Sequence, residues 1–174
     1  MNTAIFLDRD GTLNKNILRN GKLTPPYSYS EIELVDGAQN AISQFRKLNY
    51  IPIIITNQPD VSRGKVSIRD VNKINKIICE ILEIDYLYMC AHDDQDGCEC
   101  RKPKPGMIYK AAKDLDLTLT KSILIGDRWR DIHAGQAAGC KSFLIENFNG
   151  EPKPKLPYQT VPSILHLAKL LGSN

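Results

Sequence analysis

Short apolar segments alternate with longer amphipathic segments along most of this chain. The short segments are mostly apolar or β-branched over four or five residues and end at turn-forming or polar residues, which is the pattern of buried strands. Five segments follow it: residues 4–7, 51–55, 86–89, 122–125 and 142–145. The chain therefore predicts five strands.

The segments between these strands carry apolar residues three or four positions apart, as amphipathic helices do. Ser67 suits an N-cap, Pro105 suits a first helical turn, and Gly139 is typical of the position after a helix C-terminus. Strands that alternate with such helices predict an α/β fold in which helices cover both faces of a parallel sheet. The helices are expected to begin near Asp36-Gly37, Ser67, Pro105 and Asp131 and at residue 164, and the apolar face of the second comprises Ile68, Val71, Ile74, Ile77, Ile78 and Ile81.

Two segments do not fit this alternation. Residues 13–27 are polar and contain Asn20-Gly21 and Pro25-Pro26, so we expect a loop or a small hairpin there. Residues 151–157 are rich in Pro and Lys and indicate an exposed connector. Neither is long enough to fold alone, so the 174 residues predict one domain spanning 1–174.

Two carboxylates, Asp8 and Asp10, follow the first predicted strand directly, and Gly11-Thr12 come next. Alternation along an extended backbone puts the two carboxylates on one side, at the sheet edge where open α/β folds bind ligands. Crowded carboxylates repel each other unless a cation lies between them, which indicates a hard divalent cation such as Mg²⁺. The alternative is a strand-ending Asp-Gly turn with a solvated aspartate.

Polar side chains recur at the same predicted edge of the sheet. Thr56 and Asn57 follow the second strand, Arg101-Lys102 follow a loop rich in cysteine, and Asp127 follows the fourth strand. Asp127 would supply a third carboxylate for Mg²⁺, and the hydroxyl, amide and ammonium groups would donate to phosphate oxygens. Positioning and charge neutralisation of this kind are what phosphoryl transfer requires.

A second candidate metal site consists of Cys90, His92, Cys98 and Cys100. Three thiolates and one imidazole fill a tetrahedral shell, so this set predicts a structural zinc in a loop at residues 90–100 rather than a catalytic one. The alternatives are a cluster of reduced cysteines or, in an oxidising compartment, a disulfide. Cys79 and Cys140 lie outside the set, in apolar surroundings, and we expect both to be inert.

Composition and charge exclude several other classes. No apolar run is long enough to span a membrane, and the chain begins with strand sequence rather than with a signal peptide. The formal net charge of +3 is too small for the basic footprint of a nucleic-acid-binding domain. We therefore expect a cytoplasmic monomer that binds neither nucleic acid nor membrane.

Four ordered segments resemble the motifs of the haloacid dehalogenase superfamily. They are Asp8-Arg9-Asp10-Gly11-Thr12, Thr56-Asn57-Gln58, Lys102-Pro103-Lys104-Pro105 and Gly126-Asp127-Arg128-Trp129-Arg130-Asp131. With its cysteine loop, the chain resembles the zinc-containing branch that holds D-glycero-D-manno-heptose 1,7-bisphosphate phosphatases and histidinol-phosphate phosphatases. The resemblance implies a Rossmann-like three-layer sandwich with a mainly parallel five-stranded sheet and no large cap domain.

The resemblance also implies a role for each motif residue. Asp8 would be the nucleophile that forms an aspartyl-phosphate, and Asp10 would protonate the leaving alkoxide and later deprotonate the attacking water. Thr56 and Lys102 would hold the phosphoryl oxygens, and Asn57, Arg101 and Arg128 would face the substrate. The Mg²⁺ ligands would be Asp8, the backbone carbonyl of Asp10, and Asp127, with Asp131 as an orienting residue; the Zn²⁺ ligands would be Cys90, His92, Cys98 and Cys100.

The implied reaction is Mg²⁺-dependent hydrolysis of a small phosphomonoester, and two substrates are open. Basic residues near the motifs favour a sugar bisphosphate, D-glycero-D-manno-heptose 1,7-bisphosphate cleaved at its 7-phosphate. The acidic loop at residues 93–96 would instead suit the cationic histidinol phosphate, and the gap between His92 and Cys98 is closer to that branch. The matches at Asn57-Gln58 and Pro105-Gly106-Met107 favour the heptose branch. The basic residues are Arg63, Lys65, Arg101, Lys104, Arg128 and Arg130.

Two further function classes compete with a metabolite phosphatase. A polynucleotide 3′-phosphatase would use similar Asp-x-Asp-Gly-Thr chemistry, but it predicts steep salt dependence that a chain of low net charge should not show. A non-catalytic, zinc-bearing binding module would have no need for a nucleophile beside an acid. The segment at residues 18–29 is unlike the short substrate loop of heptose bisphosphatases, and its role stays open.

Overall fold

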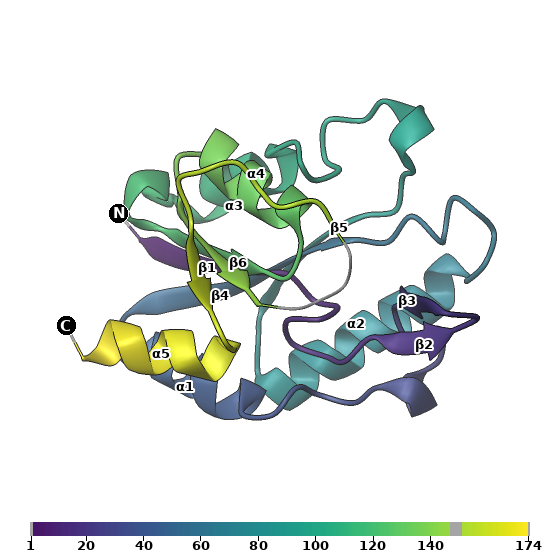
Figure 1. Cartoon of the computed structure of the whole chain (residues 1–174), viewed down its shortest axis with the longest axis horizontal. Coiled ribbons are helices and arrows are strands. Elements are labelled where there is room, and N and C mark those ends of the chain that lie inside the picture. Colours follow the sequence, from purple (N-terminus) through teal and green to yellow (C-terminus); the bar gives the residue numbers. More distant parts are fainter. Residues whose placement is uncertain (1, 147–150, 174) are drawn as a thin grey trace.

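The computed structural model describes residues 2–146 and 151–173. Its centre is a sheet of six parallel strands in the order β5-β4-β1-β6-β7-β8 (Figure 1). The predicted α/β, Rossmann-like fold is confirmed, and all five predicted strands are present. These strands are β1 (Thr3–Leu7), β4 (Tyr50–Asn57), β5 (Tyr86–Cys90), β6 (Ile123–Gly126) and β7 (Lys141–Ile145).

The sixth strand, β8 (Gln159–Val161), extends the sheet beyond the five strands that the sequence predicted. It pairs with β7 at the edge of the sheet. Only Val161 of its three residues is buried, so the segment lacks the continuous apolar run by which the other strands are recognised.

Helices cover both faces of the sheet, as the alternation predicts. The alternating side chains of β1 divide between two apolar clusters: Ile5 and Leu7 join one, and Ala4 and Phe6 join the other. The first cluster includes residues of α1, α2 and α5, and the second includes residues of α3 and α4 (Figure 1). The helices are α1 (Ala38–Lys47), α2 (Ile68–Leu82), α3 (Gly106–Leu115), α4 (Trp129–Ala137) and α5 (Ile164–Gly172).

Helix α2 buries a narrower stripe than its isoleucines predict. Ile68 and Ile81 are 46% and 41% exposed, whereas Asn75 is buried. Each residue advances about 100° around a helix, so Ile68 and Ile81 fall at the borders of the stripe centred on Val71 and Ile78. Asn75 lies within the stripe, where it contacts a buried arginine of the site.

The segment at residues 13–27 contains a hairpin that stands apart from the main sheet. Strands β2 (Ile17–Arg19) and β3 (Lys22–Thr24) pair antiparallel (Figure 1). Asn20 and Gly21 connect them with φ angles of 49° and 74°, and positive φ at both central residues is what a two-residue type I′ turn requires.

No helix among residues 2–146 and 151–173 has the length and apolar character needed to cross a membrane.

Candidate active site

Three aspartates converge at the carboxyl edge of the sheet. Because β1 lies between β4 and β6, the residues after these strands meet there. Asp8, which follows β1, donates its backbone N–H to the Ile125 carbonyl at 3.0 Å. Carboxylate oxygens of Asp8, Asp127 and Asp131 all lie within 4.8 Å of one another, and all three residues are buried. The predicted Asp8–Asp127 pairing is present, and Asp131 joins it.

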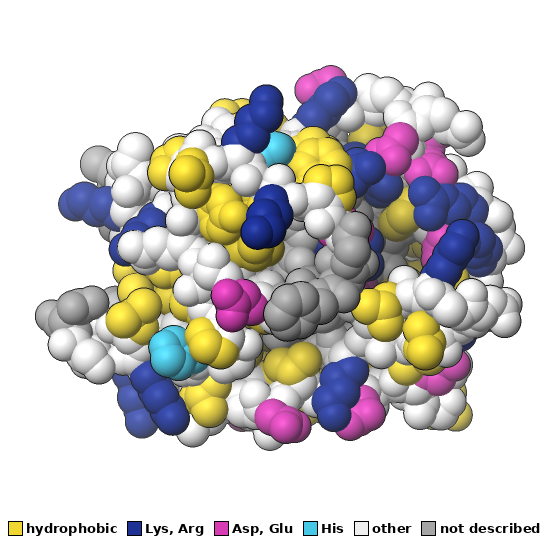
Figure 2. Space-filling view, viewed as in Figure 1, with side chains coloured by type: hydrophobic (Ala, Val, Ile, Leu, Met, Phe, Trp, Pro, Cys, Tyr) yellow, Lys and Arg dark blue, Asp and Glu magenta, His cyan; other side chains and the backbone are white. Residues whose placement is uncertain are grey.

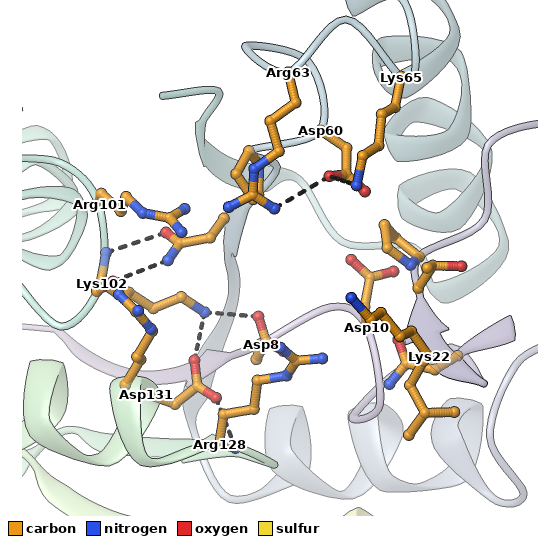
Figure 3. A pocket seen from close by; sticks show the side chains of 17 residues that line it. Asp8, Asp10, Lys22, Asp60, Arg63, Lys65, Arg101, Lys102, Arg128 and Asp131 are labelled. Atoms are coloured by element: carbon orange, nitrogen blue, oxygen red, sulfur yellow. Dashed lines mark hydrogen bonds and ion pairs between the residues drawn. The ribbon is translucent and has the colours of Figure 1, made fainter. Parts of the chain in front are cut away.

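Lys102 lies against this acidic cluster, with an exposed fraction of 2%. Its ammonium donates to Asp8 Oδ1 at 2.6 Å, to Asp131 Oδ1 at 2.5 Å and to the Ile55 carbonyl at 2.9 Å (Figure 3). Burial alone would lower the pKa of Lys102, but the carboxylates of Asp131 and Asp8 outweigh that effect and raise it. Lys102 is therefore a fixed positive charge beside Asp8. The second oxygen of Asp131 accepts from the Arg128 backbone N–H at 3.0 Å, which suits an orienting role.

The acidic cluster fits a divalent cation. Burial, together with the neighbouring carboxylate of Asp131, raises the pKa of Asp8 to about 6. Burial and the charges of Asp8 and Asp131 raise the pKa of Asp127 as well. Gly11, at φ 91°, passes so close that a Cβ there would lie 2.3 Å from Asp127 Oδ2. Three buried oxygen ligands that repel one another match the preferences of Mg²⁺.

The Asp10 carboxylate faces a different set of side chains. It accepts hydrogen bonds from Arg9 Nη2 at 2.9 Å, from Asn14 Nδ2 at 2.9 Å and from Gln58 Nε2 at 2.7 Å. Gln58 Nε2 also donates to Thr56 Oγ1 at 2.8 Å, and so links two predicted catalytic residues. The Asp10 side chain therefore keeps partners of its own and does not belong to the cluster of Asp8, Asp127 and Asp131.

Several residues around Asp10 received no role from the sequence. Arg9 is fully buried, and its Nη1 donates to Asn75 Oδ1 at 2.5 Å. Arg9 and Gln58 lie inside two of the haloacid dehalogenase motifs, and this position in the sequence could have indicated a role in the site. Asn14 and Asn75 carry no such signal: Asn14 lies outside the motifs, four residues after Asp10, and Asn75 reaches Arg9 only because helix α2 folds against the site.

A cavity of about 300 Å³ opens beside Asp8 and Asp10 (Figure 3). The predicted substrate-facing residues Asn57, Arg101 and Arg128 all line it. Asn57 Oδ1 accepts from the Lys102 backbone N–H at 3.1 Å, and its Nδ2 donates to the Lys102 carbonyl at 3.0 Å, so Asn57 fixes the Lys102 loop. Trp129 is not among the lining residues; its ring contacts His133 edge-on at 5.2 Å between centroids. Residues 22–25 of the hairpin segment form a further wall.

Arginines that line this cavity form ion pairs with aspartates of the acidic loop after β5. Arg63 Nε and Nη2 donate to the two oxygens of Asp93 at 2.6 Å each, and this pairing lowers the pKa of Asp93 to about 2. Asp94 accepts from Arg101 at 2.8 Å and from Arg130 at 2.9 Å. On the side where this loop and the hairpin lie, Figure 2 shows Lys and Arg side chains gathered among Asp and Glu side chains. The carboxylates of Asp93 and Asp94 are thus directed to internal partners.

The four predicted zinc ligands also come together. Cys98 Sγ lies 3.7 Å from Cys90 Sγ and 3.5 Å from Cys100 Sγ, and His92 Nδ1 lies 3.3 Å from Cys100 Sγ. Ligands about 2.3 Å from a tetrahedral ion are separated by about 3.8 Å. A disulfide needs sulfur atoms about 2.05 Å apart, so these distances do not support that alternative, and all five cysteines are free.

Known proteins resemble this chain in sequence and in structure. A family model described as HAD-hydrolase-like matches residues 99–162. The D-glycero-beta-D-manno-heptose-1,7-bisphosphate 7-phosphatase of Haemophilus influenzae is 33% identical over 160 residues, which cover 83% of this chain and 82% of that protein. The D-glycero-alpha-D-manno-heptose-1,7-bisphosphate 7-phosphatase of Campylobacter jejuni is 35% identical over 151 residues, which cover 83% and 82%.

Among solved structures, the D,D-heptose 1,7-bisphosphate phosphatase of B. bronchiseptica, in complex with magnesium and phosphate, superimposes with a TM-score of 0.83. The match covers 99% of both chains at 27% identity. The recognised motifs, the fold and these relatives agree. The chain belongs to the haloacid dehalogenase superfamily, in the family of the D-glycero-D-manno-heptose-1,7-bisphosphate 7-phosphatases.

Proposed function

We propose that this protein is a Mg²⁺-dependent phosphatase that works through an aspartyl-phosphate on Asp8. The observation that carries the proposal is the placement of the Asp8 carboxylate against the Lys102 ammonium and within 4.8 Å of the carboxylates of Asp127 and Asp131. Asp8, Asp127 and the backbone carbonyl of Asp10 would hold Mg²⁺, which neutralises phosphate charge when bound. Lys102 and the Thr56 hydroxyl would hold the phosphoryl oxygens, and Asp131 would orient Lys102.

The reaction has two steps in this proposal. An Asp8 oxygen attacks phosphorus, the bond from phosphorus to the ester oxygen breaks, and Asp10 gives that oxygen a proton. Asp10 then takes a proton from water as the water oxygen attacks phosphorus, the bond from phosphorus to the Asp8 oxygen breaks, and inorganic phosphate leaves with the Asp8 carboxylate restored. Arg9, Asn14 and Gln58 fix the direction of the Asp10 carboxylate in both steps.

The proposed substrate is D-glycero-D-manno-heptose 1,7-bisphosphate, cleaved at the 7-phosphate. The names of the relatives support it, for both the alpha and the beta anomer. The ion pairs of the cavity wall support it as well, because Arg63, Arg101 and Arg130 already neutralise the carboxylates of Asp93 and Asp94. Those carboxylates are then not available for the ammonium of histidinol phosphate. A single domain, a monomer and a cytoplasmic location belong to the same proposal.

Phosphate release from a small panel tests this assignment. With Mg²⁺ present, kcat/KM should be highest for the heptose 1,7-bisphosphate, lower for fructose 1,6-bisphosphate, and lowest for histidinol phosphate. A preference for histidinol phosphate would overturn the substrate while leaving the phosphatase chemistry in place. Release from a polynucleotide 3′-phosphate, with steep salt dependence, would overturn both the substrate and its class.

Mg²⁺ should stabilise the protein more at high pH than at low pH. The pKa of folded Asp8, about 6, lies above its ordinary value of 3.8, so the folded state gains stability from that proton at low pH and loses it as the pH rises through 6. Above this range Mg²⁺ can replace the proton. We expect saturating Mg²⁺ to raise the Tm by about 5 °C at pH 8 and by much less at pH 5. A shift that is equal at both pH values in scanning calorimetry would contradict this prediction.

One zinc ion per chain is the second metal in the proposal. Elemental analysis of protein purified without added metal should find about one equivalent. Cys98→Ser should lose it and should lower activity, because Arg101 and Lys102 directly follow the ligand Cys100. Cys79→Ser, outside the cluster, is the matched control and should keep the metal. Metal-free protein with full activity would refute a structural zinc.

A further inference from the structure

The cations that line the cavity are nearly all neutralised. Seven lysines and arginines line it, and six of them form ion pairs with carboxylates. Lys22 is the seventh, and no side chain within residues 2–146 and 151–173 forms an ion pair with it. The six paired residues are Arg63, Lys65, Arg101, Lys102, Arg128 and Arg130.

The hairpin that carries Lys22 is fixed to the rim of the cavity. Lys22 begins β3 and pairs in register with Arg19 of β2. Arg19 forms an ion pair with Glu31, donates to the Pro25 carbonyl at 2.8 Å and stacks over the Tyr27 ring at 4.3 Å. The Tyr27 hydroxyl in turn donates to the buried Asp60 at 2.6 Å. These contacts hold the exposed Lys22 over the cavity, where no carboxylate of residues 2–146 and 151–173 forms an ion pair with it.

Lys22 also lies on the side of the cavity toward which a remote group of the substrate would extend. In Figure 3 it stands on the same side as Asp10, across from Arg101 and Lys102. Asp8 and Lys102 hold the phosphoryl group in transfer, and Asp10 marks the side on which the rest of the ester leaves. A second phosphate on the leaving part can bind Lys22 without breaking an existing ion pair, whereas each of the other six cations would have to share or lose a carboxylate.

From these observations we infer that Lys22 binds the second phosphate of a bisphosphate substrate and sets the preference for it over the monophosphate. The inference rests on the proposed function. Lys22 is a specificity residue, not part of the reacting group. An ammonium is a compact charge with three rotatable donors, which suits a phosphate at an open rim. The inference also gives a role to the segment at residues 18–29, which contains Lys22 and whose role the sequence left open.

The test compares two substrates that differ only in the second phosphate, heptose 1,7-bisphosphate and heptose 7-phosphate. In wild type, kcat/KM should favour the bisphosphate, and added salt should reduce that preference because the rim is exposed. Lys22→Ala should lower kcat/KM for the bisphosphate by about 10-fold, mostly through KM, and leave the monophosphate unchanged. Lys22→Arg should retain most of the preference. Lys15 is an exposed lysine outside the cavity, and Lys15→Ala should leave kcat/KM unchanged for both substrates.

A second readout separates this inference from the proposed function. Fructose 1,6-bisphosphate and fructose 6-phosphate are compared as inhibitors of p-nitrophenyl phosphate hydrolysis, which needs only the Asp8 chemistry. If wild type does not cleave heptose phosphates, the proposed substrate fails, and the inference stands only if Lys22→Ala abolishes tighter inhibition by the bisphosphate. If wild type prefers the bisphosphate and Lys22→Ala keeps that preference in both assays, the inference is overturned and the proposed function remains.

Discussion

Asp8→Asn should abolish turnover while leaving the fold intact. The amide has nearly the shape of the carboxylate, but it cannot attack phosphorus, and it removes one proposed Mg²⁺ ligand. Loss of a nucleophile in covalent catalysis lowers kcat by about 10⁴- to 10⁶-fold. Stability without metal should not fall, because the substitution removes one of three buried carboxylates that repel each other. Phosphate release with Mg²⁺ and a urea unfolding curve measure the two effects.

Asp85→Asn provides the matched control for this variant, because Asp85 is exposed and lies outside the cavity. It should keep wild-type activity. If Asp8→Asn retains activity near that of wild type toward a generic phosphomonoester, the nucleophile is misassigned. If it unfolds instead, the activity result carries no information on mechanism, and Asp8→Glu replaces it as the test of nucleophile position.

Lys102→Met should reduce both activity and stability. Without the ammonium, the buried carboxylates of Asp8 and Asp131 lose their shared partner. Breaking a buried ion pair in this way lowers the free energy of unfolding by about 3–5 kcal/mol. Activity should fall by about 10³-fold, because the phosphoryl oxygens lose a charge-assisted donor in a dry site. Both measurements are made at pH 7.5. Stability is measured in the presence of a chelator, and activity is measured in the presence of Mg²⁺.

Lowering the pH should restore much of the stability that Lys102→Met loses. The pKa of Asp8 is already about 6 with Lys102 present, and removal of the lysine raises it further. Protonation at pH 5 therefore relieves the repulsion, and the difference in urea midpoint from wild type should narrow. Lys104→Met, in the same loop but exposed, with Glu99 as its ion-pair partner and the Cys98 carbonyl as a hydrogen-bond acceptor, should show little change. A constant deficit from pH 5 to pH 7.5 would mean that lost packing, not charge, causes the destabilisation.

The sequence predicted the parts of this protein that depend on local pattern. The continuous apolar run before Asp8 and the N-cap at Ser67 specify β1 and α2 without any tertiary information. The motif residues converge because parallel strands bring their carboxyl ends to one edge. This geometry explains why Asp8 and Asp127 lie together, whereas Asp131, expected only as an orienting residue, also joins their cluster. The set of three cysteines and one histidine was inferred from its ligand types and spacing.

Tertiary pairing decided what the sequence left open. The acidic loop could bind a cationic substrate or serve as surface, and only folding shows that Arg63 and Arg101 occupy Asp93 and Asp94. The short strand β8, in which only Val161 is buried, forms because its backbone pairs with β7 at the edge of the sheet. In the same way, the role of Gln58 between Asp10 and Thr56 depends on three-dimensional contacts that spacing alone does not reveal.

The central claim, covalent catalysis by Asp8 with Asp10 as acid and base, is tested most directly in the Asp10→Asn variant. With p-nitrophenyl phosphate the leaving group needs no proton, so the first step should persist while hydrolysis of the intermediate is slowed. Rapid mixing should give a burst of one nitrophenolate per enzyme, and acid-quenched protein should carry one phosphoryl group on the peptide that contains Asp8. Loss of steady-state activity with neither a burst nor a phosphorylated peptide, or a phosphoryl group on another residue, would contradict the account.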